Sequence, residues 1–445
     1  GMQTEALASM LAICRQAAKY GFTTEEFNRF KDEYISLLEN SLMSAEKRTS
    51  KGLARECYCN YLYGTDLSPV EDFVAIMKQI VETVPLDSIN FRMSKLLPNN
   101  DDNMAIVNWN VDKKRLVYPT KKALRKALRK GRKLPIAPYV DSLHDARLIS
   151  EEPIGGDIVS QTENDNIGYK RLLLSNGAKV LLRHTDIEKS QVLFKAYGNA
   201  GWTMYGCEDD PNRQLFNSVM FGNNGYTASQ VNKILSGKQV HLSHSIGQRT
   251  FSFTGSFNPK DTETFMQLLY ANFTNQTADE NEFRNLLEET TILLENSKAV
   301  AEEAFSDSVA VISVNHHPRF KLLEVEDLTK VSLDRELEIF KDQTSNPSNY
   351  TFIFVGNFSD SIIMPLIEKY IASLPIRKKI SNGEYIKTWV QEDLYCHFKR
   401  EMETAKSMVK MDWFCESFPY TLENKIKVDL ATRILNMVYT QIVRE

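Results

Sequence analysis

The feature that most constrains the fold of this sequence is an internal repeat built around the pentapeptide LLENS. The pentapeptide occurs at residues 37–41 and again at 293–297, each time within a pattern typical of an acidic amphipathic helix. When the two copies are superimposed, Phe27 coincides with Phe283. The paired leucines that open each pentapeptide are predicted to pack in the core. One shared pentapeptide is weak evidence of duplication, so the order of the surrounding elements has to recur as well.

The elements that follow the pentapeptide recur in the same order. After one insertion, Leu86-Asp87 coincides with Leu333-Asp334, and the apolar segment 103–110 coincides with 350–357. The matched region covers about 85 residues, and a repeat period near 250 residues is too long for stacked solenoid units. The repeat therefore indicates duplication of whole domains.

The first copy lacks a first half. Residues 169–275 precede the second long helix, whereas about 24 residues precede the first. We therefore expect the chain to begin partway through a domain. A length of 445 residues requires two to four domains. The predicted divisions are the end of one domain at 1–112, a linker at 113–160, a complete domain at 161–380 and the start of another at 381–445.

Hydrophobic periodicity predicts both helices and strands. Residues 171–184 contain two apolar runs around Asn176-Gly177, which predicts a hairpin, and 239–257 predicts a second one. Further strands are predicted at 104–111, 191–201, 351–358 and 407–415. Helices are predicted at about 4–19, 24–48, 50–63, 69–82, 86–97, 209–221, 227–236, 260–272, 279–304, 332–344, 361–373 and 421–443. The predicted class is α+β, with antiparallel sheets that carry helices packed on one face.

Composition excludes several classes of protein. The chain is 42% hydrophobic and 25% charged with a net charge of -4, which is ordinary for a soluble protein and indicates no general polyanion partner. It has no run of about 18 apolar residues that could span a membrane. Gly1 before Met2 resembles a tag remnant, so the lack of a signal peptide says nothing about export. The six cysteines form no CxxC pair and are expected to be free, partly buried thiols.

Motifs for metal or nucleophilic catalysis are missing from the sequence. The seven histidines form neither H-E-x-x-H nor H-x-x-E-H, and there is no G-x-S-x-G and no P-loop. His241 and His244 lie in an alternating strand, where residues three apart point to opposite faces. We therefore do not expect them to bind one metal ion.

A basic helix is predicted inside the proline-punctuated linker. Its apolar stripe consists of Ala123, Leu124, Ala127 and Leu128. Its eight cations are Lys121, Lys122, Arg125, Lys126, Arg129, Lys130, Arg132 and Lys133. A solvated linker helix that docks its stripe on a neighbouring domain is the favoured interpretation, and a functional polyanion-binding surface is the alternative. No aromatic residues interleave the charges for base stacking, so nucleic acid is not expected as a partner.

An ordered set of motifs resembles the M16 (pitrilysin/insulinase-like) zinc metallopeptidases, in particular the long bacterial form with four homologous domains. The segments are YGFTTEEFNRFKDEYI at 20–35, LSNGAKVLLRHTD at 174–186, GNAGWTMYGCEDD at 198–210, YTASQVNKILSGK at 226–238 and TFIFVGNF at 351–358. The resemblance implies duplicated LuxS/metallopeptidase-like domains. It makes 1–112 the C-terminal half of the second domain, 161–380 a complete third domain and 381–445 the start of the fourth.

The resemblance also implies where the chemistry lies. In this family the first domain carries His-x-x-Glu-His; its two His and a downstream Glu bind zinc, and the middle Glu activates water. The corresponding helix here has Leu215 and Val219 at the two His positions and Ser218 at the Glu position. The implied third domain is therefore inactive, with no catalytic residue and no zinc in this chain. Zinc is expected in the absent N-terminal domain.

One substrate-binding residue is implied. The fourth domain of the family carries an Arg, with a Tyr seven residues later, that binds the peptide backbone and stabilises the oxyanion. The ending ILNMVYTQIVRE resembles the approach to that pair, so Arg444 matches the Arg. The chain ends at Glu445 before any Tyr, and an ordinary helix arginine is the alternative.

The resemblance thus implies part of a zinc-dependent peptidase that closes around peptides or unfolded proteins as a clamshell. This chain would supply the non-catalytic substrate-binding half. The alternative is a non-catalytic M16-like subunit that serves as a scaffold or as the partner of an active peptidase. The implied partners are a peptide substrate and either the rest of its own polypeptide or a partner subunit. A periplasmic or exported bacterial location is the family-based expectation.

Overall fold

The computed structural model describes most of the chain. The described residues are 2–96, 105–107, 119–141, 143, 146–298, 300–388, 390, 393–399, 406–413 and 418–444. The chain divides into two compact units. The first comprises Gly1–Tyr205, Leu215–Arg284 and Ser332–Glu384, and the second comprises Gly206–Gln214, Asn285–Val331 and Tyr385–Glu445. The domain boundaries that we drew from the sequence remain predictions.

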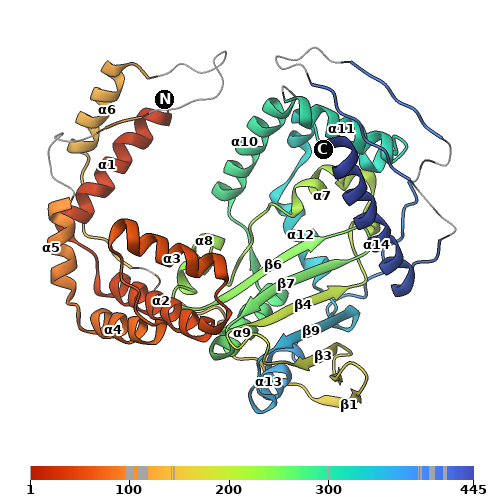
Figure 1. The fold of residues 1–445 in the computed structure, drawn as a ribbon, viewed down its shortest axis with the longest axis horizontal. Coiled ribbons are helices and arrows are strands. Elements are labelled where there is room, and N and C mark those ends of the chain that lie inside the picture. The colour runs from red at the N-terminus through yellow and green to blue at the C-terminus, as the bar shows by residue number, and fades with distance from the viewer. Residues whose placement is uncertain are drawn as a thin grey trace. The chain divides into compact units, whose positions relative to one another are not determined.

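Five helices open the chain, as the periodicity predicts (Figure 1). They are α1 (Met2–Tyr20), α2 (Thr24–Met43), α3 (Ser50–Tyr63), α4 (Val70–Thr83) and α5 (Leu86–Leu96). Thr23 and Glu26 form a reciprocal capping box that starts α2. The predicted strand 104–111 lies mostly outside the described residues, and 105–107 has no regular secondary structure. The basic helix is present as α6 (Lys121–Lys133).

A seven-stranded sheet forms the centre of the first unit (Figure 1). In spatial order its strands are β1 (Ile158–Asn164), β2 (Tyr169–Leu174), β3 (Lys179–His184), β9 (Tyr350–Gly356), β4 (Val192–Gly198), β7 (Phe251–Phe257) and β6 (Val240–Ile246). All neighbours are antiparallel except β3 and β9. Both predicted hairpins, β2–β3 and β6–β7, are confirmed. Gly177 turns the first hairpin at a φ of 80°, which glycine adopts without steric cost.

The sheet buries one face. Along β4, Phe194 and Ala196 are buried whereas Leu193, Lys195 and Tyr197 are exposed. The buried face packs against α9 (Thr262–Thr274) and α12 (Leu333–Gln343) through a cluster of phenylalanines, and α13 (Asp360–Leu366) packs against α9. Each fully buried phenylalanine contributes about 1.5–3 kcal/mol. One-sided packing of this kind confirms the predicted α+β class.

Several predicted helices are shorter than their patterns. The helix predicted at 24–48 is α2, which ends at Met43, and the one at 361–373 includes α13, which ends at Leu366. The helix predicted at 209–221 is α7 (Asp210–Phe216), followed by tight turns to Val219 and the short strand β5 (Gly222–Asn223). The helix predicted at 279–304 is divided into α10 (Glu280–Ser297) and α11 (Ala301–Ser313).

The two copies of LLENS differ in burial. In α2, Leu38 is 5% exposed, but Leu37 is 55% exposed. In α10, Leu293 is 67% exposed and Leu294 is half-buried. The prediction that both leucine pairs are core is therefore right for Leu38 alone, since Leu294 is only partly covered and Leu37 and Leu293 are exposed.

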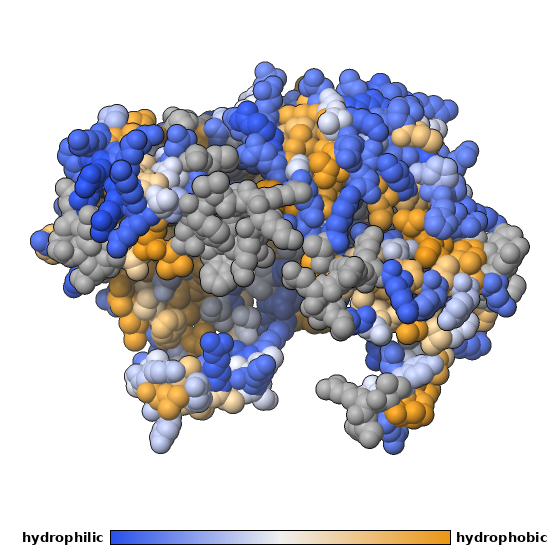
Figure 2. Space-filling model, turned by 90° about the horizontal axis from the view of Figure 1, so that it is seen from above, coloured by the Kyte–Doolittle hydropathy of each residue, from blue (hydrophilic) through white to orange (hydrophobic). Residues whose placement is uncertain are grey.

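The second unit ends in α14 (Leu422–Tyr439), whose described side chains are all partly or fully exposed. Helix α8 (Ala228–Ile234) and strand β8 (Gln276–Thr277) complete the regular elements of the first unit. Hydrophobic residues reach the molecular surface in several places (Figure 2). Within the described residues, none of the helices is both long and apolar enough to cross a membrane. Cys14, Cys57, Cys207 and Cys396 are free and exposed, so the expected partial burial holds for Cys59 alone of the five described cysteines.

Candidate functional site

Strand β6 forms one edge of the sheet, and its side chains alternate between the two faces. His241, Ser243 and Ser245 are exposed. The Ile246 N–H is directed away from β7 and donates to Asn217 Oδ1 at 2.8 Å. Since backbone direction also alternates along an antiparallel strand, the peptide groups of Leu242 and His244 point to the same outer edge. This edge is the kind of surface to which an extended peptide adds as a further strand.

The segment that matches the zinc motif lies beside this edge. Leu215 and Val219 are 4% and 3% exposed, whereas Ser218 is exposed. Because α7 ends at Phe216, these residues do not share one face of a continuous helix, as an i, i+4 ligand pair requires. Neither aliphatic side chain can bind zinc, and a serine hydroxyl is no general base at neutral pH. The residues present do not fit a zinc site.

His244 lies in an aromatic cluster rather than in a metal site. Its ring centroid is 4.9 Å from that of Phe340 and 5.4 Å from those of Phe216 and Phe221. Burial lowers the pKa of His244 to about 4, although a hydrogen bond to the backbone of Phe216 opposes the shift. Its Nε2 atom is buried and has no hydrogen-bond partner among the described residues.

The two histidines of β6 point to opposite faces, as predicted: His241 is exposed and His244 is in the cluster. No group of three or more His, Cys, Asp or Glu that could hold a metal ion occurs within the described part of the chain. Arg444 closes the helical turn Thr440–Arg444, and its side chain lies outside what the structure describes. The role implied for Arg444 therefore stays a prediction.

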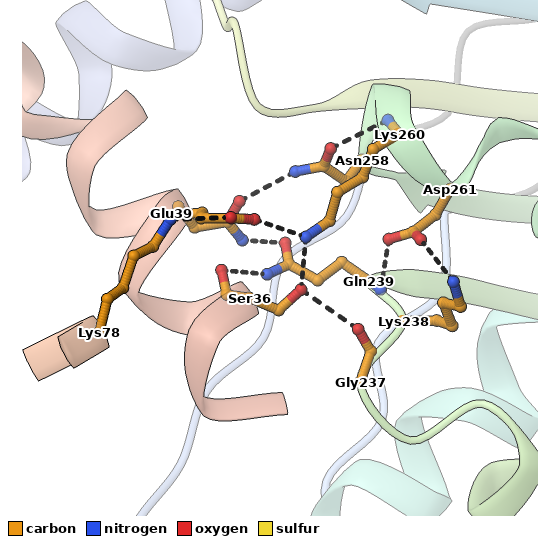
Figure 3. A network of polar contacts seen from close by, with 10 residues as sticks. Ser36, Glu39, Lys78, Gly237, Lys238, Gln239, Asn258, Lys260 and Asp261 are labelled. Carbon is orange, nitrogen blue, oxygen red and sulfur yellow. Dashed lines mark hydrogen bonds and ion pairs between the residues drawn. The ribbon is translucent and has the colours of Figure 1, made fainter. Parts of the chain in front are cut away.

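Polar contacts join α2 to the end of the β6–β7 hairpin (Figure 3). The Ser36 hydroxyl donates to the Gly237 carbonyl oxygen at 3.2 Å, and the Gln239 side chain donates to the Ser36 carbonyl oxygen at 2.9 Å. Lys260 Nζ donates to Ser36 Oγ at 2.8 Å. Because Gln239 directly precedes β6, these contacts fix the start of the edge strand against the N-terminal helices.

The first LLENS copy supplies the charged part of the same network. Glu39 accepts from Lys260 at 2.8 Å and from Lys78 of α4 at 2.9 Å. Asn40 accepts from Asn258 at 3.0 Å. The hydrogen bond from Lys260, followed by that from Lys78, lowers the pKa of Glu39, against a smaller effect of burial. Glu39 is therefore anionic at neutral pH and holds two cations.

The sequence pattern assigns no role to three polar residues that shape this edge. Asn217 accepts the outward N–H of Ile246. Glu39 and Asn40 anchor α2 through hydrogen bonds from Lys78, Lys260 and Asn258. The repeat does not reveal the anchoring role of Glu39 and Asn40, because the equivalent residues of α10, Glu295 and Asn296, are exposed.

The chain is similar in sequence to zinc proteases. It is 22% identical over 362 residues to the "Zinc protease PQQL-like" of Arabidopsis thaliana, covering 80% of this chain and 35% of the relative. It is 21% identical over 383 residues to the "Probable zinc protease PqqL" of Escherichia coli (strain K12), covering 83% of this chain and 40% of the relative. The chain thus spans less than half the length of these relatives. No protein-family model matches it.

The fold is also similar to a solved structure, that of the periplasmic protease PqqL from Escherichia coli. The TM-score is 0.50 at 18% identity, with 85% of this chain and 42% of that chain covered. The fold and the relatives define the class, a homologue of zinc proteases. This class agrees with the resemblance to the M16 peptidases that the sequence motifs indicate.

Proposed function

We propose that this chain forms a non-catalytic, substrate-binding part of a zinc-dependent peptidase that acts on peptides or unfolded proteins. The observation that carries the proposal is the burial of Leu215 and Val219 at the positions matched to zinc ligands, with Ser218 at the position of the base. A zinc peptidase needs three protein ligands and a base that activates water. The chemistry therefore comes from another domain, on the same polypeptide or on a partner.

The edge strand supports the substrate-binding role. The outward peptide groups of β6 offer main-chain hydrogen bonds of the kind that recognise an extended peptide without regard to its sequence. His241, Ser243 and Ser245 line the exposed face next to that edge. We extend the proposal to Arg444, which would bind the peptide backbone from the following domain.

Helix α14 supports pairing with a further domain. Its apolar side chains include Leu430, Ile434 and Met437, which are 56%, 60% and 73% exposed. An amphipathic helix gains its stability mainly by packing its apolar face. An exported location is proposed from the Escherichia coli relative, whose structure is described as that of a periplasmic protease.

A peptidase assay tests the prediction that this chain has no catalytic activity by itself. The purified chain is mixed with zinc and a fluorogenic peptide, and we expect no cleavage above the buffer rate. Cleavage that a chelator abolishes would contradict the proposal.

Amide hydrogen exchange with an unstructured peptide tests the binding role. We expect slower exchange at the outward amides of Leu242 and His244 when the peptide is added. The amide of Ser243, which faces β7, serves as the internal control and should not change. Unchanged exchange at all three positions with saturating peptide would exclude β6 as the binding edge.

The alternative is a non-catalytic scaffold or partner subunit of the same family. Both hypotheses predict that this chain alone has no peptidase activity. The sequence of the gene upstream of this chain is therefore needed to distinguish them. A His-x-x-Glu-His motif upstream in the same reading frame supports the enzyme half, and a native start near Met2 supports a separate subunit.

A further inference from the structure

Helix α6 presents its charge on one side. At 3.6 residues per turn its cations fall within about half of the helix circumference, and its alanines, leucines and Gly131 fall on the other half. Six of the cations are exposed and have no ion pair within the described part of the chain: Lys121, Lys122, Arg125, Lys126, Arg129 and Lys133. We call these six residues the cationic face. Lys130 lies 3.9 Å from Glu5 of α1 in an exposed pair.

The opposite half of α6 is occupied. Helices α1 and α6 lie side by side (Figure 1), and Ala127 is 4% exposed. Gly131 permits the close approach, because a Cβ there would lie 2.6 Å from the Ala8 carbonyl oxygen. Arg15 of α1 donates to the carbonyl oxygens of Gly131 and Leu134 at 2.8 and 3.2 Å, which fixes the C-terminal end of α6. This packing agrees with the prediction that the apolar stripe of α6 docks on a neighbouring part of the protein. It leaves the cationic face exposed.

This concentration of positive charge stands out in a chain with a net charge of -4. The surface around α6 forms a dense hydrophilic area at the left of Figure 2. Thirteen residues span roughly 20 Å, and the cations spread along that length instead of converging on one point. Such an array matches a flat surface with many mobile negative charges better than a single bound anion.

We propose that the cationic face is an electrostatic docking surface for an anionic membrane. Clusters of four to eight Lys or Arg on an amphipathic helix are typical of binding to anionic lipid headgroups. Because the apolar stripe is buried against α1, the helix cannot insert as interfacial helices do, so attachment is peripheral and sensitive to salt. The helix has no aromatic residue on which bases could stack, which disfavours single-stranded nucleic acid.

Vesicle co-sedimentation of the full chain tests the proposal. The vesicles are phosphatidylcholine alone or phosphatidylcholine mixed with phosphatidylglycerol. We expect binding to the mixed vesicles alone, with loss of binding as salt shortens the Debye length from about 30 Å at 0.01 M to about 8 Å at 0.15 M. Equal binding to both kinds of vesicle would overturn the proposal.

Charge reversal locates the site. The variant Arg125→Glu/Lys126→Glu/Arg129→Glu should bind at least about 100-fold more weakly, since each Lys or Arg near an anionic surface contributes roughly fivefold. The control Lys51→Glu/Lys379→Glu/Lys399→Glu changes three exposed lysines elsewhere by the same charge and should bind like the wild type. Equal losses in both variants would show an effect of net charge and overturn the assignment to α6.

Two further measurements keep the result interpretable. The variant Arg125→Gln/Lys126→Gln/Arg129→Gln preserves helix propensity, and it should keep the wild-type circular dichroism while binding more weakly. A DNA duplex is tested in the same buffer as the vesicles. Tighter binding to the duplex than to the mixed vesicles would assign the cationic face to nucleic acid and overturn the membrane proposal.

Discussion

At the scale of single residues, the surroundings of His244 decide its protonation state. The aromatic rings around it stabilise a neutral imidazole and exclude the water that an imidazolium ion needs. The folded state therefore favours the neutral imidazole over the imidazolium ion, and the pKa of His244 falls from 6.5 to about 4. The stability contributed by the neutral ring is complete above pH 6.5 and is lost as the pH falls toward 4.

The substitution His244→Phe removes this titration. Between pH 6.5 and pH 4 we expect the wild type to lose about 3 kcal/mol more unfolding free energy than the variant, from a shift of about 2.5 pKa units. Denaturant unfolding of both proteins at several pH values measures the difference. Parallel pH profiles for the two proteins would show that His244 is not the group responsible.

The segment matched to the zinc motif gives a second prediction. The double substitution Leu215→His/Val219→His should not create stoichiometric zinc binding, because α7 ends at Phe216 and the two imidazoles would not share one face of a continuous helix. Each buried, unpaired imidazole should cost about 1–3 kcal/mol of stability. Zinc titration by calorimetry and thermal unfolding check both parts, with Ser218→Ala as an exposed control that should leave stability unchanged.

At the scale of elements, α2 is held by charge as well as by apolar packing. Glu39 bridges Lys78 of α4 and Lys260 beyond β7, so one carboxylate joins three elements. These side chains are about one-third exposed, so each pair contributes modestly. The lowered pKa of Glu39 means that the contribution is present above pH 4.5 and is lost as the pH falls through the folded-state pKa.

The substitution Glu39→Gln should therefore lower the unfolding free energy by about 1 kcal/mol at pH 7, and the difference should shrink as the pH falls below 4.5 and through the lowered folded-state pKa. The matched control is Glu33→Gln on the same helix, where the side chain is exposed and no ion pair is found within the described residues. A loss at pH 7 that persists unchanged at pH 3 would show that Glu39 acts through packing rather than charge.

At the scale of the whole molecule, the exposure of α14 bears on the proposed pairing with a further domain. Its apolar residues are exposed within the second unit, so in the isolated chain its backbone hydrogen bonds depend on local helix stability. Under the proposed function we expect fast amide exchange along α14 in the isolated chain and protection when the proposed zinc-bearing half is added. Helix α9, which is already in the core, serves as the unchanged reference. Equal exchange of α14 with and without the added half would contradict pairing through this helix.

Much of the fold could be predicted because its signals are local. The Asn176-Gly177 turn, the capping box at Thr23 and the alternation along β6 and β7 depend on residues close in sequence, and each appears where expected. The ends of α7 could not be predicted in this way. Helical periodicity continues beyond Phe216, but the chain turns there, with the N–H groups of Ser218 and Val219 donating to carbonyl oxygens three residues back.

The sequence by itself determined the repeat, the class of fold and the resemblance to the M16 peptidases, and it predicts that Leu215 and Val219 stand where zinc ligands would. Only the tertiary structure decided which copy of LLENS is buried, why His244 is neutral and which half of α6 faces outward. Periodicity identifies the residues that share a face of an element, but burial depends on whether another element covers that face. The same pentapeptide anchors one helix and lies exposed on another because its neighbours differ, not because its own residues do.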